Sequence, residues 1–309
     1  MARPKSINIT DARSVSSYKQ YNQSSNSLFH FMSEPEYLLD ALARKALVPR
    51  YCWEDIEYLD IKTEKDGAFK RVAVLQKCFC DIPMSKIART TTITETRTTS
   101  SNKTRSTAKS YTHTDIYGKY AIAFTKEWGK QHRIQPIHYI DISSPFATLL
   151  SISICNYLQS DSDDETSVNG AMLELQLALA KPHFGKMLRK DEKDNAVTII
   201  KNFYDEQEWR YIPDAIDSNF EIIIANEFYF IKRHDGKSPI DIFNERLVQT
   251  DNNSLWLHFN YSDISYMIVA DDDTRTKIIH HLLGLPIDEQ ERYTLISKML
   301  TVEQITGDM

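Results

Sequence analysis

Hydrophobic positions recur with helical spacing soon after the start of the chain. A helix over 34–47 would carry one apolar stripe, formed by Leu38, Leu39, Leu42 and Ala46. Ser33 and Glu36 stand at the spacing of a capping box, in which each side chain binds a backbone N–H of the first turn. Pro35 fits the first turn of a helix, so the pattern predicts a helix that begins just after Ser33.

Helical patterns of the same kind return in the second half of the chain. The predicted helices are 145–158, 170–181, 239–249, 273–283, 287–299 and 302–306. Strong helix formers fill 170–181, and a proline opens 239–249. Thr301 and Gln304 form a second predicted capping box, which places the start of the last helix.

Strand patterns lie between these helices. Residues 72–83 alternate and are rich in β-branched side chains, which predicts a strand that contains Cys78 and Cys80. Further strands are predicted within 28–31, 117–129, 134–142, 208–213, 220–230 and 263–270. The segment 181–195 is charged and is predicted to be a connection. Strands and helices interleave without a regular βαβ repeat, so the predicted class is α+β, with mixed or antiparallel sheets flanked by helices.

Two polar segments define the expected domain organisation. Residues 1–25 are predicted to be an N-terminal arm, followed by a single domain over 26–309. Within that domain, 15 of the 26 residues in 89–114 are Ser or Thr, and five basic residues against Glu95 give a local net charge of +4. This insertion is either a surface loop or hairpin arm, or a basic finger that contacts phosphate or an acidic partner.

Composition narrows the classes of protein that remain. The net charge of −6 argues against a generally basic nucleic-acid binder, although 89–114 leaves nucleic acid open as a partner. Four cysteines in 309 residues indicate a reducing compartment, and no secretory or membrane-spanning pattern is present, so a cytoplasmic protein is expected. The eight glycines include no Gly-x-Gly, which excludes the Rossmann and Walker A phosphate loops. No residues show the spacing of a metal site.

The stretch "NFYDEQEWRYIPD" at 202–214 is the main candidate for chemistry. If the chain is extended there, Glu206, Glu208 and Arg210 point to one face, and Trp209 points to the other. Two carboxylates aimed at one place can serve catalysis. They can also pair with Arg210 in a structural ion cluster, and the residues alone leave both interpretations open.

A series of phrases in fixed order resembles the AbiGi family, whose members are antitoxins of bacterial abortive phage-infection systems. The phrases include "VPRYCWED", "CFCDIPMS", "IQPIHYI", "KPHFGK", "FYDEQEWRYIP" and "DISYMIVADDD", and they run from about residue 26 to the C-terminus. The Ser/Thr-rich segment 89–114 departs from the family pattern. The resemblance implies antiviral defence and a partner that is a cognate toxin or another protein of the defence system.

The chain is also similar, in one respect, to ADP-ribosyltransferases, which use a His, an aromatic residue and a Glu from successive strands. His30 matches the first position, Tyr120 or Tyr117 the second, and Glu208, preceded by Glu206, the third. This resemblance implies a scaffold that binds NAD, and either an ADP-ribosyltransferase or an NAD hydrolase if the protein is an enzyme.

The same resemblance implies a role for each residue. Glu208 would stabilise the oxocarbenium-like state formed when nicotinamide leaves ribose, and Glu206 would orient the acceptor or act as a general base. The expected cofactor-binding residues are His30, Tyr117, Tyr120 and Arg210. The competing hypotheses are a non-enzymatic antitoxin or regulator that binds a toxin, and a subunit of a larger defence complex.

Overall fold

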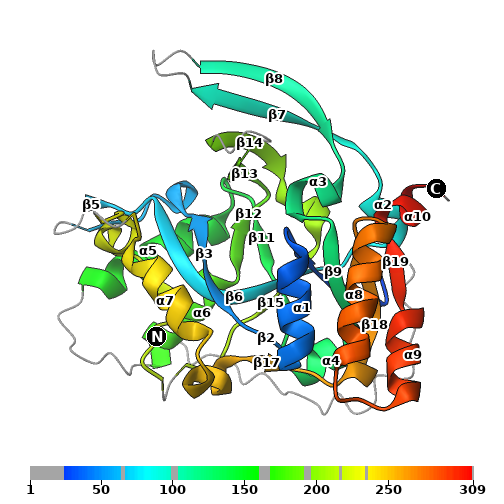
Figure 1. Cartoon of the computed structure of the whole chain (residues 1–309). Helices are drawn as coiled ribbons and strands as arrows, with labels where there is room; N and C mark the ends of the chain where they lie inside the picture. Colours follow the sequence, from blue (N-terminus) through cyan, green and yellow to red (C-terminus); the bar gives the residue numbers. More distant parts are fainter. Residues whose placement is uncertain are drawn as a thin grey trace, which may run out of the picture.

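The computed structural model describes residues 24–63, 67–98, 104–159, 168–190, 196–215, 218–233 and 236–307. Most of the predicted arm, 1–23, lies outside these ranges, as does the tip of the insertion at 99–103. Within them the fold is α+β, as predicted (Figure 1).

A large mixed sheet forms the centre of the molecule. Its main path runs β10-β15-β6-β1-β9-β18-β19, and β3 and β16 also pair with β6. The bounds are β1 (Ser27–Met32), β3 (Arg50–Asp55), β6 (Arg71–Cys80), β9 (Tyr120–Thr125), β10 (Gln135–Pro136), β15 (Glu208–Tyr211), β16 (Ile223–Ile224), β18 (Ile264–Val269) and β19 (Met299–Thr301). All pairs in this sheet are antiparallel except β18 with β19.

Alternation along β1 divides the core into two layers. Leu28 and Met32 pack into the layer that contains α1 (Pro35–Arg44), α8 (Asp272–Gly284) and α9 (Glu289–Ser297), which stand side by side in Figure 1. Phe29 points the other way, into the layer that contains α2 (Met84–Ile87) and α10 (Val302–Gly307). Both faces of β1 are therefore covered, which explains why its apolar residues do not alternate with polar ones.

A second sheet is built around the Ser/Thr-rich insertion. Its order is β13-β14-β7-β8, with β13 (Phe184–Lys190), β14 (Ala196–Asn202), β7 (Thr91–Thr98) and β8 (Thr104–Tyr111). The hairpin β7–β8 pairs over eight positions and extends beyond the body of the molecule (Figure 1). The insertion is therefore a hairpin arm, one of the two structures expected for it.

The remaining elements connect and cover these sheets. The helices are α3 (His113–Tyr117), α4 (Lys126–Gln131), α5 (Pro145–Gln159), α6 (Val168–Ala178) and α7 (Pro239–Leu247). Short 3-10 turns are η1 (Glu57–Leu59), η2 (Phe203–Glu206), η3 (Glu227–Phe230), η4 (Thr250–Leu255) and η5 (Tyr261–Asp263). Two-strand ladders join β2 (Ala46–Leu47) to β17 (Leu257–His258), β4 (Lys62–Thr63) to β5 (Gly67–Ala68), and β11 (His138–Ile140) to β12 (Ala180–Pro182).

The predicted helices are all present, but one predicted cap is wrong. Helix α1 begins at Pro35 with Glu34 as its N-cap, and no side chain caps it. Glu36 is therefore one position too early in the helix to complete a capping box with Ser33. At α10, in contrast, the Thr301 hydroxyl accepts from Gln304 N and the Gln304 side chain accepts from Thr301 N, both at 3.1 Å, as predicted.

Several strand predictions need correction. Residues 184–190 are strand β13 rather than a connection, because they pair with β14, whose backbone is in turn paired with the hairpin. The predicted strand in 220–230 is reduced to Ile223–Ile224 followed by η3, and 134–142 is divided between two short strands of different sheets. The charged composition of 181–195 favours a loop. Residues 184–190 nevertheless form a strand, because pairing with β14 satisfies their backbone hydrogen-bonding groups.

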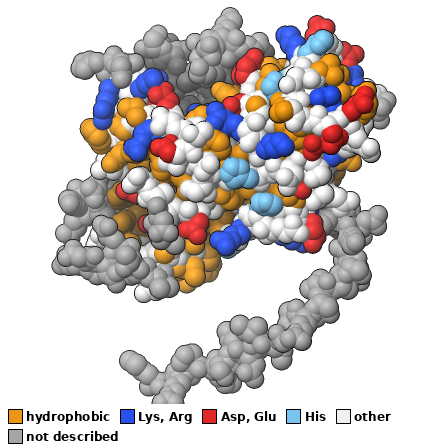
Figure 2. All heavy atoms as spheres, turned by 60° about the horizontal axis from the view of Figure 1, so that its bottom comes forward, with side chains coloured by type: hydrophobic (Ala, Val, Ile, Leu, Met, Phe, Trp, Pro, Cys, Tyr) orange, Lys and Arg blue, Asp and Glu red, His pale blue; other side chains and the backbone are white. Residues whose placement is uncertain are grey.

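The face shown in Figure 2 mixes basic and acidic side chains, without a broad region of one sign. Across the part of the chain that the structure covers, no helix is both long enough and apolar enough to cross a bilayer.

Candidate functional site

The acids Glu206 and Glu208 are each only 3% exposed, and a tight turn brings them together. Glu206 ends η2, Gln207 has a left-handed φ of 44°, and Glu208 begins β15. Asn202 stabilises the turn, since its side chain accepts a hydrogen bond from Tyr204 N at 3.1 Å. The prediction that the chain is extended through both acids is therefore wrong, because Gln207 between them has a left-handed conformation.

Arg210 is fully buried and pairs directly with Glu208. Its Nε donates to Glu208 Oε1 at 2.7 Å, and one terminal nitrogen donates to Glu54 Oε1 at 2.6 Å. The other terminal nitrogen donates to the carbonyl of Ala178 at 2.5 Å. The guanidinium thus joins β15 to β3 and to the end of α6, as a buried structural arginine does.

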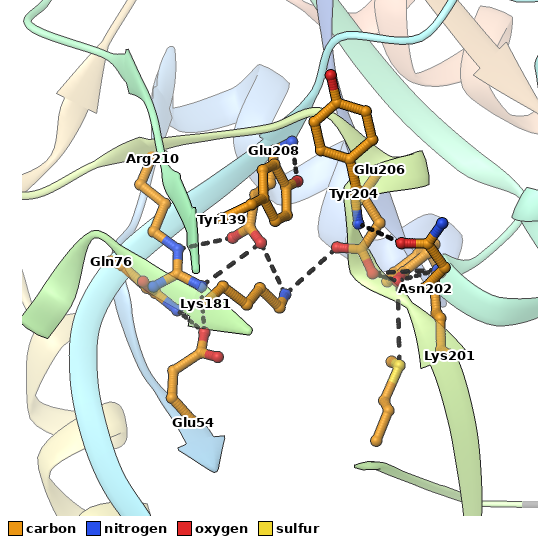
Figure 3. Close-up of polar contacts among 12 residues, drawn as sticks. Glu54, Gln76, Tyr139, Lys181, Lys201, Asn202, Tyr204, Glu206, Glu208 and Arg210 are labelled. Atoms are coloured by element: carbon orange, nitrogen blue, oxygen red, sulfur yellow. Dashed lines mark hydrogen bonds and ion pairs between the residues drawn. The ribbon is translucent and has the colours of Figure 1, made fainter. Parts of the chain in front are cut away.

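Lys181, on β12, lies between the two acids (Figure 3). Its Nζ is 2.7 Å from Glu208 Oε2 and 3.3 Å from Glu206 Oε2. Burial alone would raise the pKa of Glu208, but the charges of Arg210 and Lys181 outweigh it and hold that pKa below its ordinary value. Burial likewise opposes the charge of Lys181, and the two carboxylates raise its pKa well above the usual range.

Glu206 makes a second set of contacts on its other oxygen. The Tyr117 hydroxyl, on α3, donates to Glu206 Oε1, and Lys201 Nζ lies 3.1 Å from the same oxygen. Lys201 also donates to the Tyr117 hydroxyl at 2.5 Å. Burial, and then the charge of Glu206, raise the pKa of Tyr117 well above its usual value, so this phenol stays protonated.

These groups form one ion network with balanced charge. We call it the acid–base cluster: the carboxylates of Glu54, Glu206 and Glu208 with the cations of Lys181, Lys201 and Arg210. Gln76 donates to Glu54 at 2.9 Å, and Glu208 N donates to the Tyr139 hydroxyl at 2.7 Å. Each carboxylate has a cationic partner within 4 Å, and two of these ion pairs, Lys181 with Glu208 and Arg210 with Glu54, connect residues of different strands.

Two of the predicted site residues lie on the opposite face of the sheet. Glu208 pairs with Cys80, which pairs with Phe29, so these three side chains share a face. His30 is one residue further along β1 and therefore points to the other face, where Tyr120 packs against the core beneath α1 and α8. His30 and Tyr120 therefore do not converge with Glu208.

His30 instead has a structural partner on β6. Its Nδ1 lies 2.8 Å from the carbonyl oxygen of Cys78. Burial, and then the positive charge of Lys77, lower the pKa of His30 well below its ordinary value, so the ring is neutral. Of the predicted aromatic residues, only Tyr117 contacts an acid of the cluster.

Two cavities of about 960 Å³ each meet at Tyr117. One is lined by Trp53, Lys181 and Phe203, and the other by His30 and Lys77. Neither Glu206 nor Glu208 lines either cavity, although Glu54 of the cluster lines the first one together with Lys181. In the ranges that the structure covers, no group of His, Cys, Asp and Glu could hold a metal ion.

Two of the three cations that neutralise the acids, Lys181 and Lys201, were not predicted from the sequence, whereas Arg210 was. Lys181 and Lys201 come from short strands that were assigned to a charged connection or left unassigned, and Glu54 is 156 residues from Arg210. The alternation in "AVTIIKN" at 196–202, with Lys201 next to two isoleucines, was the one available signal for a strand there.

A second surface stands out on α5 and α6. Helix α5 has no charged residue over its whole length, and it buries Ala147, Leu150 and Ile154 on one side. Its other side exposes Phe146, Leu149 and Ile152 by 45%, 63% and 50%. On α6, Met172 and Leu175 are exposed by 55% and 39%. We call these five side chains the α5–α6 face. The two helices contact each other, and exposed apolar side chains on adjoining helices are typical of a surface that binds a protein.

Comparisons with known proteins agree on one family. Residues 105–270 match the model of the family described as abortive phage resistance protein AbiGi, antitoxin. The chain is 30% identical over 273 residues to the abortive phage resistance protein AbiGi of Lactococcus lactis subsp. cremoris. That alignment covers 85% of this chain and 99% of the relative. No solved structure matches the chain.

Proposed function

Because the chain belongs to the AbiGi family of abortive phage resistance proteins, we propose that it acts in bacterial antiviral defence as an antitoxin that binds its cognate toxin. The observation that carries the binding role is the solvent-exposed, apolar α5–α6 face, within which α5 has no charged residue. In this role the α5–α6 face binds the toxin, and the acid–base cluster stabilises the folded protein.

The chemistry of the α5–α6 face favours a protein over a small molecule or a polyanion. Leu149 alone is 63% exposed, on a helix whose inner side is packed into the core. Burying such side chains against a partner gains about 25 cal/mol for each Å² removed from water. Without charges on α5, that gain is not offset by desolvating ions.

The state of Glu208 supports a non-enzymatic role. Stabilising an oxocarbenium-like sugar requires a carboxylate that faces the ligand with its charge available. Glu208 is 3% exposed, and its two oxygens accept hydrogen bonds from Arg210 and Lys181. An NAD-consuming reaction at Glu208 therefore gains no support from this geometry, and neither do NAD contacts from Arg210, which is fully buried.

Coexpression tests the proposal directly. A candidate toxin gene, sought next to the gene for this protein, would be induced in a phage-sensitive host. Survival would be scored with wild-type protein, Leu149→Glu, or the matched control Tyr293→Glu. Tyr293 is exposed by 59% on α9, far from the α5–α6 face in the sequence. We expect rescue by the wild type and by Tyr293→Glu, and loss of rescue and of copurified toxin with Leu149→Glu.

The outcomes separate the two parts of the proposal. If the wild type does not rescue the host, the antitoxin role is wrong. If Leu149→Glu rescues as well as the wild type, the antitoxin role stands and the docking face is wrong. Calorimetry with NAD, together with Glu208→Gln in the same rescue assay, would reveal an enzymatic role if NAD binds and the folded variant loses activity.

A further inference from the structure

A cavity of about 660 Å³ lies at the base of the hairpin arm; it shares Lys201 with the acid–base cluster and no residue with the α5–α6 face. Residues from β7, β14, α2 and α3 line it, so it lies where the second sheet meets the body of the molecule. We call it the arm cavity. Its lining combines three kinds of group: exposed aromatic or apolar side chains, exposed basic side chains, and hydroxyls.

The apolar part of the lining is formed by Phe184, Ile200 and Tyr204, which are exposed by 65%, 49% and 52%. Phe184 pairs with Asn202, and Ile200 is two residues before Asn202, so Phe184 and Ile200 share the outer face of the sheet. The Tyr204 ring is held in place by His183, which stacks on it at 5.7 Å with planes 10° apart. Fixed, exposed rings of this kind are surfaces on which nucleic-acid bases stack.

The charge at this cavity is positive, in contrast to the chain as a whole. Lys86 and Arg89 line it and are exposed, and among the residues that line it the only carboxylate is Asp205. The one acid of the arm, Glu95, is 1% exposed on the inner face, where Lys109 lies 3.4 Å away and Tyr111 donates to it. Glu95 is therefore neutralised internally and does not oppose the basic residues at the surface.

The outer face of the arm supplies hydroxyl groups and little bulk. Thr92 and Thr94 on β7 and Ser106 and Ser110 on β8 are exposed, with Ala108 between the two serines. Alternation places these side chains on the same face as Ile200, which pairs with Thr94. Short hydroxyl side chains let a phosphate backbone approach closely and can hydrogen-bond to it.

We propose that the arm cavity and the outer face of β7–β8 bind single-stranded nucleic acid. Phe184 and Tyr204 contact bases, Lys86 and Arg89 contact phosphates, and the Thr and Ser hydroxyls contact the backbone. A strand with unpaired bases fits because stacking requires exposed base faces, which a duplex does not offer. This role is independent of toxin binding by the α5–α6 face.

Fluorescence anisotropy with a labelled RNA of about 12 nucleotides tests this assignment, since one such site covers roughly 4–16 nucleotides. A DNA strand of the same sequence and the corresponding duplex would be titrated in parallel, at about 50 and 200 mM NaCl. Variants would be Tyr204→Ala, Phe184→Ala and the pair Lys86→Ala with Arg89→Ala. Matched controls are Phe228→Ala, 58% exposed, and Lys62→Ala, whose side chain is also 58% exposed and pairs with Asp60.

We expect the single strands to bind more tightly than the duplex. Each aromatic variant should bind about tenfold more weakly, as stacking on one ring predicts. Log affinity falls as log salt rises, and in the double basic variant this fall should be less steep. The magnitude of the slope should decrease by about 1.4, because two phosphate contacts are lost. The control variants should bind with the affinity of the wild type. The ratio of the RNA affinity to the DNA affinity shows whether the protein contacts the 2′-hydroxyl of the sugar.

The proposal is overturned if neither strand binds, if the duplex binds as tightly as the single strands, or if the aromatic variants bind like the wild type. Melting temperatures of all variants distinguish a lost contact from a lost fold. Equal competition by an unrelated polyanion such as heparin, combined with unchanged binding of the aromatic variants, would indicate a general electrostatic contact and would also reject the site.

Discussion

Arg210 Nε donates to Glu208 Oε1 at 2.7 Å, although the two residues are only two positions apart on the same short strand. Side chains at i and i+2 share a face of a strand, so the pair forms within β15 itself. Lys181 then approaches the second oxygen of Glu208 from β12. The carboxylate is therefore held between two cations from two different strands. Removing its charge can distinguish a structural role of Glu208 from a catalytic one.

Glu208→Gln should destabilise the protein by about 3 kcal/mol, because it leaves Arg210 and Lys181 buried without a full counter-charge. Urea denaturation at pH 7 measures this. The matched control is Glu57→Gln, since Glu57 pairs with Lys186 at 3.6 Å but both side chains are more than half exposed. The control should cost less than about 1 kcal/mol. A fully stable Glu208→Gln protein that loses activity would instead favour a catalytic role.

The same pair predicts a dependence on pH. The folded state holds the pKa of Glu208 below its ordinary value, so its stabilisation is complete above the unfolded pKa of about 4.3. It is lost as the pH falls through the lower, folded pKa. The stability difference between wild type and Glu208→Gln should therefore narrow below about pH 4. A difference that stays constant from pH 7 into strong acid would contradict the ion-pair assignment.

His113 should make the protein less stable in mild acid. Its ring packs between Phe31 and Tyr117, each with a centroid distance of 4.6 Å. Burial, and then the charge of Lys201, lower the pKa of His113 to about 3. Below the unfolded value of about 6.5 the unfolded chain takes up the proton, so stability falls as the pH decreases towards the folded pKa.

Between pH 6.5 and pH 5, protonation of His113 in the unfolded chain lowers the free energy of unfolding by about 1.6 kcal/mol. His113→Phe keeps the ring contacts and should remove this part of the pH slope in urea denaturation, while His30 retains its own share. The control is His138→Phe, the same substitution at an exposed histidine, measured in the same way. An unchanged slope in His113→Phe would show that His113 is accessible to protons in the folded protein.

Neighbouring leucines on α5 should respond in opposite ways to a charge. Leu149 is 63% exposed, whereas Leu150 is 4% exposed and belongs to the core. Leu149→Asp should change the thermal midpoint by no more than a few degrees, since surface substitutions cost about 0.5 kcal/mol or less. Leu150→Asp buries an unpaired charge and should unfold the region. Thermal denaturation followed by circular dichroism measures the midpoint of each variant. If both variants lose stability to a similar extent, the side of α5 that carries Leu149 is buried rather than exposed.

Gly118 should tolerate no side chain. Its φ is +109°, and a Cβ there would overlap the carbonyl of Met32 at the end of β1. Gly67 also has a positive φ, of +72°, but a Cβ there would meet nothing within 4 Å. Gly67→Ala should cost about 1–2 kcal/mol for the backbone alone. Gly118→Ala should cost clearly more, because the β1 backbone must also move. Equal costs in denaturation would contradict the close approach.

The sequence by itself determined the elements whose signals are local. The stripe through Leu38 and Leu42, the alternation in 72–83 and the Thr301–Gln304 box each depend on neighbours within a few residues, and each prediction is confirmed. The pairing of Arg210 with a nearby acid was likewise one of two interpretations that the sequence allowed. The phrases in family order also indicated the family.

Tertiary structure decided which groups meet. Lys181 reaches Glu208 from 27 residues away and Glu54 reaches Arg210 from 156 residues away, and no periodicity encodes such distances. A single left-handed residue, Gln207, turned a predicted straight strand into a bend that still brings Glu206 to Glu208. The register of β1 with β6 and β9 put His30 and Tyr120 on the other face of the sheet from Glu208. Alternation fixes the relative faces of residues within one strand, but only pairing with other strands fixes which side chains those faces meet.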